Sequence, residues 1–117
     1  MDIRDLVRSI LSGDLLTARQ CVADAQREQF RWDELAMPGD LTERELTVAA
    51  GIVELLAMRN GSTAPRWTTA IGGLRESLVL DPGLEQLPRS FARARIAGPE
   101  PLRRRNLVAL PDFLAVA

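Results

Sequence analysis

The chain has 117 residues, of which 46% are hydrophobic and 26% are charged, and its formal net charge is −1. This length and composition predict one folded domain with a single hydrophobic core, and they exclude an intrinsically disordered chain. The near balance of charges lacks the basic excess with which nucleic-acid-binding proteins neutralise phosphates, so it argues against a nucleic-acid partner.

The residue types argue against an enzyme. The chain has no histidine, no tyrosine and one cysteine, which removes the commonest general base and excludes Cys–His and Ser–His–Asp arrangements. A zinc site would have to be built from carboxylates and one thiol, and Gly72-Gly73 lacks the spacing and the lysine of a phosphate-binding loop. A catalytic pair of carboxylates brought together from distant segments is the one alternative that the sequence leaves open. We therefore predict a non-catalytic protein without a metal or a cofactor.

The sequence also predicts a cytoplasmic protein. Cys21 is the only cysteine, so the chain forms no internal disulfide and suits a reducing compartment. Asp2, Arg4 and Asp5 interrupt the first apolar residues, which is not typical of a signal peptide. No apolar run approaches the roughly 20 residues that a membrane span requires.

Apolar residues at helical spacing predict two helices in the first third of the chain. The first begins after a capping Asp2 and ends at Gly13, and its apolar face consists of Ile3, Leu6, Val7, Ile10 and Leu11. The second begins at Asp14 and runs to about Glu34. Trp32, near its end, lies either in the core or on an exposed binding platform.

The third predicted helix begins at Thr42 and ends at Asn60-Gly61. Thr42 and Glu45 have the spacing of a capping box, in which each side chain accepts a hydrogen bond from the other residue's backbone N–H. The apolar residues that follow cover much of the circumference of the helix. We therefore expect it to be the central, most buried helix.

The second half of the chain predicts two more helices and a tail. One helix begins near Pro65 and extends to about Leu78, and Gly72-Gly73 inside it indicates either a kink or the close approach of another backbone. A shorter helix covers about residues 84–96. Without alternating apolar residues for a sheet, the fold class is all-α: a bundle of about five helices over residues 1–97, followed by a proline-punctuated tail over residues 98–117.

The tail holds the candidate contact residues. Its apolar side chains, which include Phe113 and Leu114, are costly to expose at about 25 cal/mol per Å², so the tail packs either on the bundle or on another protein. The run Arg103-Arg104-Arg105 is either a solvated surface or a group of cations that pair with carboxylates of a partner. These five residues are the candidate partner-binding site.

A family resemblance points to one kind of partner. The segment from Gly98-Pro99-Glu100-Pro101 to Asn106-Leu107, with Pro111-Asp112-Phe113-Leu114 after it, resembles the C-terminal signature of a group of small bacterial helical proteins. Residues 65–68 are similar to theirs too. Such proteins resemble the antitoxin-like partners of nucleotidyltransferase-type toxins in two-gene modules. The resemblance implies that the tail contacts an enzyme, and it implies no catalytic residues.

Three hypotheses for the function follow. The first is an interaction module that binds and inhibits a toxin enzyme. The second is a DNA-binding regulator whose helix-turn-helix consists of the helices predicted over residues 42–60 and 65–78. Much of the surface of the second of these helices is expected to pack in the core, which leaves little of it to contact DNA. The third is a structural homo-oligomer in which a second copy covers the tail.

Overall fold

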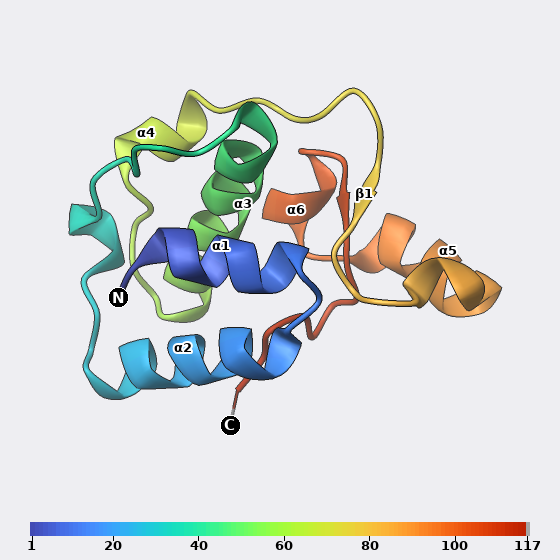
Figure 1. Cartoon of the computed structure of the whole chain (residues 1–117), viewed down its shortest axis with the longest axis horizontal. Helices are drawn as coiled ribbons and strands as arrows, with labels where there is room; N and C mark the ends of the chain where they lie inside the picture. Colours follow the sequence, from blue (N-terminus) through green and yellow to red (C-terminus); the bar gives the residue numbers. More distant parts are fainter. Residues whose placement is uncertain (117) are drawn as a thin grey trace.

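A computed structural model describes residues 1–116, and in this part of the chain it contains six α-helices, two 3₁₀ turns and two short strands. The elements in chain order are α1 (Ile3–Leu11), α2 (Leu15–Arg27), η1 (Trp32–Glu34), α3 (Glu43–Arg59), α4 (Arg66–Thr69), β1 (Leu78–Val79), η2 (Leu84–Gln86), α5 (Pro88–Ala97), α6 (Glu100–Arg103) and β2 (Leu107–Val108). The fold is therefore mainly helical, as predicted, but α4 and α6 are single turns and the small sheet was not predicted (Figure 1).

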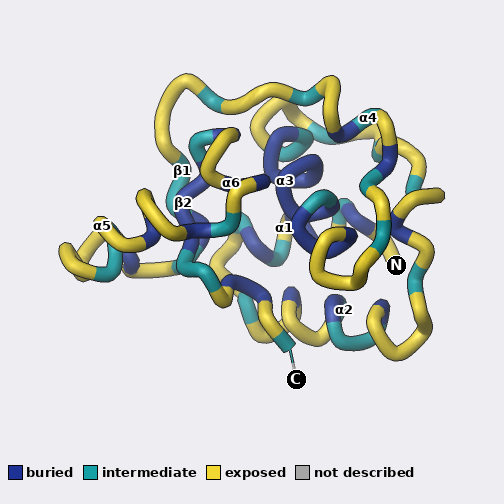
Figure 2. The backbone as a smooth tube through the Cα atoms, turned by 180° about the vertical axis from the view of Figure 1, so that it is seen from behind, coloured by how far each residue is buried: buried dark blue, intermediate teal, exposed yellow. Residues whose placement is uncertain are grey.

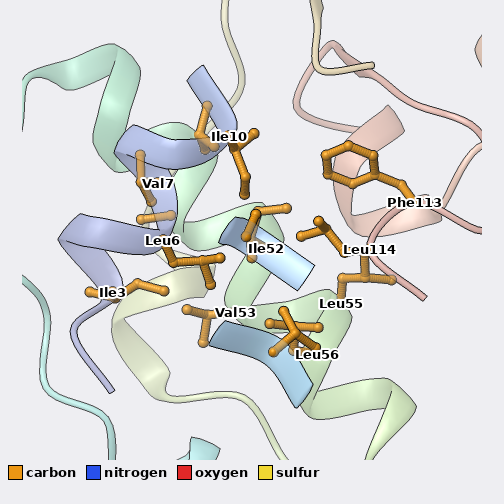
Figure 3. Packing of buried hydrophobic residues seen from close by; sticks show 14 of the residues in the cluster. Ile3, Leu6, Val7, Ile10, Ile52, Val53, Leu55, Leu56, Phe113 and Leu114 are labelled. Carbon is orange, nitrogen blue, oxygen red and sulfur yellow. The ribbon is translucent and has the colours of Figure 1, made fainter. Parts of the chain in front are cut away.

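The two N-terminal helices form a hairpin. Both begin at the predicted aspartates: the Asp2 carboxylate accepts a hydrogen bond from the backbone N–H of Arg4, and the Asp14 carboxylate accepts one from that of Thr17. Gly13 joins the helices with a φ of +82°, a left-handed conformation that glycine adopts without steric cost. The apolar face of α1 lies against α3 (Figure 3).

Helix α2 is shorter than predicted. It ends at Arg27 rather than near Glu34 because the chain reverses at Gln29, whose φ is +53°. After this reversal the rings of Phe30 and Trp32 meet edge to face with their centroids 4.8 Å apart. Trp32 is 2% exposed, so it is a core residue and not a binding platform.

Helix α3 is the centre of the molecule, as predicted. Its capping box is present: Thr42 N–H donates to Glu45 Oε1 at 2.9 Å, and Glu45 N–H donates to Thr42 Oγ1 at 3.1 Å. Ten of its seventeen residues are buried, and the helix packs against α1 on one side and α6 on another. No helix within residues 1–116 is long and apolar enough to cross a membrane.

The helix predicted from Pro65 to Leu78 is wrong, because α4 ends at Thr69. The segment that follows lies against the backbone of Arg105: Leu74 N–H donates to Arg105 O at 3.0 Å, and a Cβ built on Gly73 would lie 2.8 Å from Arg105 Cα. The close approach of another backbone is therefore the reason for this glycine, and it replaces the helix. The same result removes the second helix of the helix-turn-helix hypothesis.

The tail packs on its own chain. β2 forms a parallel pair with β1, in which Leu78 is the partner of Leu107 and Val79 is the partner of Val108. Farther along, Phe113 and Leu114 enter the main core, and Figure 3 shows Leu114 beside the α3 side chains. Figure 2 shows the chain at β2 coloured as buried, in agreement with the burial of residues 107–109. The tail thus completes the core of residues 1–97 and is not a separate unit.

Helix α5 projects from one end of the molecule. Figures 1 and 2 show it at the end of the longest dimension, with β1 and α6 between it and α3. It is held there by a small apolar cluster of Leu84, Ala94 and Val108. Most of the other α5 residues are exposed, so this helix offers its surface to solvent over most of its length.

Candidate functional site

The three consecutive arginines of the candidate site have different environments, and Arg105 is buried. Its guanidinium donates to three backbone carbonyls: Nη1 to Pro101 O at 2.9 Å, Nη2 to Thr68 O at 2.8 Å and Nε to Ile71 O at 3.2 Å. It also forms an ion pair with Glu54. This one side chain therefore joins α3, the α4 turn, the segment after α4 and α6.

Glu54 is the carboxylate that balances the buried guanidinium. Its side chain is only 11% exposed, and it pairs with both Arg104 and Arg105. Burial lowers the pKa of Arg105, and the charge of Glu54 opposes this effect, so the group stays protonated at neutral pH. Arg104 lies at the surface, and the hydrogen bond to Glu54 raises its pKa.

The apolar members of the candidate site are also buried. Phe113 is 2% exposed and Leu114 is 1% exposed. Arg59 on α3 holds this turn of the tail by donating to Phe113 O and, at 3.0 Å, to Pro111 O. The structure thus places Arg105, Phe113 and Leu114 inside the molecule, where a partner reaches them only if the tail detaches. Of the five predicted residues, Arg103 and Arg104 lie at the surface.

The structure reveals a second group of surface residues, of which only Arg103 was predicted from the sequence. We call this group the basic surface; it lies on α5, at the residue before it and on α6, and it consists of Leu87, Arg89, Arg93, Arg95, Ile96 and Arg103. All six residues are exposed, and Ile96 is 75% exposed. Within residues 1–116, no carboxylate lies at ion-pair distance from any of its four arginines.

Charge is segregated along the chain, and this signal was visible in the sequence. Residues 87–105 contain six arginines and one acidic residue, whereas residues 1–86 contain nine arginines and fourteen acidic residues. The net charge of −1 hides this asymmetry because the two regions, at +5 and −5, cancel, and Asp112 supplies the remaining negative charge. A local positive field of this kind attracts acidic surfaces and speeds association with them.

Another hollow lies away from the basic surface. It has a volume of about 540 Å³ between the end of α1 and residues 77–83, and its ionisable groups are Asp81 and Glu85. The Asp81 carboxylate accepts a hydrogen bond from Leu110 N–H at 2.8 Å. This bond holds the tail against the segment that follows β1. Within residues 1–116, no three potential ligands from His, Cys, Asp or Glu are grouped to hold a metal ion.

The burial of Asp81 gives a prediction about pH. Burial raises the pKa of this carboxyl, and the hydrogen bond from Leu110 only partly opposes the effect. The folded state therefore holds the proton more tightly than the unfolded state, so the stability that this group contributes is present below its usual pKa of 3.8 and is lost as the pH rises through the raised value. Asp81→Asn keeps an acceptor for Leu110 and removes the charge. At pH 7 we expect this variant to unfold at a slightly higher temperature than the wild type. Its free energy of unfolding should be larger by less than about 1 kcal/mol, because solvent screens a half-buried site.

Thermal unfolding at several pH values checks this expectation. The advantage of Asp81→Asn should shrink toward pH 4, where the wild-type carboxyl takes up its proton. Asp81→Ala is the control, since it loses the acceptor and should be less stable than Asp81→Asn at every pH. An Asn variant that is less stable than the wild type at pH 7 would show that the ionised carboxylate is favoured in the folded state.

Comparisons of this chain with protein-family models, with curated proteins and with solved structures find no match.

Proposed function

We propose that the protein is a non-catalytic interaction module that binds an acidic face of a protein partner through the basic surface. One observation carries this proposal: Arg89, Arg93, Arg95 and Arg103 have no carboxylate partner within residues 1–116, whereas Arg104 and Arg105 do. Five other arginines also lack a carboxylate at ion-pair distance in residues 1–116, but they are spread over α2, α3, α4 and the segment after α4: Arg19, Arg44, Arg59, Arg66 and Arg75. Arg89, Arg93 and Arg95, by contrast, lie together on α5, the helix that projects from the core.

The chemistry of the basic surface is that of a contact region. Arginine is enriched at protein interfaces because its planar group pairs with carboxylates in a bidentate manner and its stem packs against apolar atoms. Leu87 and Ile96 are 57% and 75% exposed, so each adds apolar area that a partner can bury at about 25 cal/mol per Å². A mixture of exposed aliphatic and unpaired cationic side chains supports binding to a partner that offers carboxylates around an apolar centre.

The family resemblance suggests the kind of partner. We place the protein with antitoxin-like partners that bind and inhibit a nucleotidyltransferase-type toxin in the cytoplasm. Arg103 and Arg104 are the members of the predicted site that would contact the toxin directly. Arg105, Phe113 and Leu114 would act indirectly, because they hold the tail and α6 in the positions from which α5 projects.

A tagged pull-down from the source organism tests the proposal. The wild type is compared with Arg89→Glu/Arg93→Glu/Arg95→Glu, whose three substitutions lie on the exposed side of α5. The control is Arg44→Glu/Arg66→Glu/Arg75→Glu, which makes the same change in net charge at exposed arginines outside the basic surface. We expect one stoichiometric protein with the wild type and with the control, and at least a tenfold loss of it with the α5 variant.

The outcomes separate the proposal from its alternatives. Equal recovery of the partner by the α5 variant would show that the contact lies elsewhere. If the wild type recovers no protein, the interaction hypothesis fails, and sedimentation at several concentrations then tests self-association. Recovery of DNA that weakens steeply as salt rises would favour the regulator hypothesis instead.

A further inference from the structure

Two arginines of the basic surface meet at a small hollow. The hollow has a volume of about 220 Å³ and lies where α5 faces the turn between α6 and β2. Its lining consists of Arg95, Arg103, Asn106, Leu107 and Val108. The only charged groups in this lining are the two guanidinium groups, and neither has a carboxylate partner within residues 1–116.

Each of the two guanidinium groups makes one contact within residues 1–116 and leaves its terminal amino groups without a hydrogen bond there. The Arg95 guanidinium carbon lies 5.6 Å from the centroid of the Phe91 ring, which is a cation–π contact. Arg103 Nε donates to Gly98 O at 2.7 Å. These contacts restrict both side chains while their terminal amino groups make no hydrogen bond within the described chain. Less conformational entropy is therefore lost when a ligand binds.

The third polar side chain at the hollow, Asn106, already has hydrogen-bond partners within the chain. The Asn106 amide nitrogen donates to Leu74 O and Arg75 O, and its oxygen accepts from Ser77 Oγ. The amide thus forms a fixed part of the wall and offers no donor to a ligand. The side-chain donors that the hollow offers to a ligand are therefore guanidinium N–H groups, which select a compact group with several acceptor oxygens.

We propose that this hollow is an oxyanion site, which takes one carboxylate or phosphoryl group between Arg95 and Arg103. The inference deepens the proposed function, and it rests on that function only in assigning the group to the partner: the occupant is then a carboxylate of an acidic side chain on the partner's surface. A free phosphate-bearing ligand is the other source of the same chemistry. Either occupant would satisfy two cations that the folded chain leaves unpaired.

The test is a titration of the full chain with inorganic phosphate, followed by the backbone amide shifts of residues 95–108 in ¹H–¹⁵N spectra. Sodium chloride of equal ionic strength is the reference. We expect saturable shifts with the wild type, and about a tenfold weaker affinity with Arg95→Gln and with Arg103→Gln, because each removes one of two charge-assisted donors. Arg93→Gln loses the same charge on the same helix but does not line the hollow, so it should change the affinity by less than about twofold.

Two results would overturn the oxyanion site: shifts that rise linearly with phosphate and match those of the chloride reference, or equal weakening in Arg93→Gln and Arg95→Gln. The source of the group is decided by adding phosphate to the complex recovered in the pull-down. Release of the partner at the concentration that saturates the hollow supports a carboxylate of the partner. An intact complex with phosphate bound overturns that assignment and leaves the site to a free ligand, and the titration stands even if no partner is recovered.

Discussion

Replacing Arg105 by methionine is expected to lower the free energy of unfolding by about 3–5 kcal/mol, because it breaks a buried ion pair from one side. Glu54 would remain largely buried, with only the exposed Arg104 to balance it. The carbonyls of Thr68, Pro101 and Ile71 would each lose a donor, and buried polar groups without partners are costly. Urea unfolding followed by circular dichroism at neutral pH measures the change.

The neighbouring arginine provides a matched control. Arg104→Met removes the same charge, and Arg104 also pairs with Glu54, but its own side chain is 45% exposed. Exposed ion pairs contribute at most about 1 kcal/mol, so this variant should stay close to the wild type. If the two variants were equally stable, Arg105 would not be the residue that joins the helices.

The second large effect is expected at Gly73. Alanine there would place a Cβ 2.8 Å from Arg105 Cα and 3.0 Å from its carbonyl carbon, and these are backbone atoms that cannot move aside without displacing the tail. We expect a loss of about 2–3 kcal/mol, which is typical of overpacking in a rigid surrounding. The same urea experiment measures it.

Gly72 is the control for this substitution, since no atom lies within 4 Å of a Cβ built on it. Gly72→Ala should change the free energy of unfolding by about 0.5 kcal/mol or less. The two neighbouring glycines differ mainly in whether another backbone lies against them. Similar losses at both positions would mean that the segment after α4 is not fixed by its contact with Arg105.

The elements that were predictable from the sequence are those fixed by nearby residues. Helix α1 follows from its apolar spacing and the Asp2 cap, and α3 follows from the Thr42 capping box, because these signals act within one or two turns of helix. The inference that Gly72-Gly73 marks either a kink or a close backbone was correct in its second form. Local chemistry left the two outcomes open, and only the position of Arg105 decides between them.

The elements that were not predictable depend on distant contacts. Helix α4 stops after one turn because the tail takes the place of its continuation, and β1 exists only because Leu107 and Val108 pair with it. No local feature distinguishes Arg105 from the two arginines before it. Its burial is decided by Glu54, which lies 51 residues earlier in the chain. The assignment of the apolar tail to a partner surface was open for the same reason.

In the structure, the residues of the predicted site have different roles from those that the sequence suggested. The tail residues that suggested a docking segment complete the core. Three unpaired arginines lie together on α5, within the shorter helix predicted over about residues 84–96, to which the sequence had assigned no contact residues. The local excess of arginine over residues 87–105 was the available signal. In this account the tail holds α6, and the unpaired arginines of α5 and α6 are left to meet a partner.

Amide hydrogen exchange, measured on the free protein and on its complex with the recovered partner, tests this account most directly. The account predicts that the amides of residues 107–114 exchange slowly in the free protein and change little on binding, whereas residues 88–103 gain protection in the complex. The contrary result is fast exchange of residues 107–114 in the free protein together with new protection there on binding. That outcome would show that the partner contacts the tail and not the basic surface.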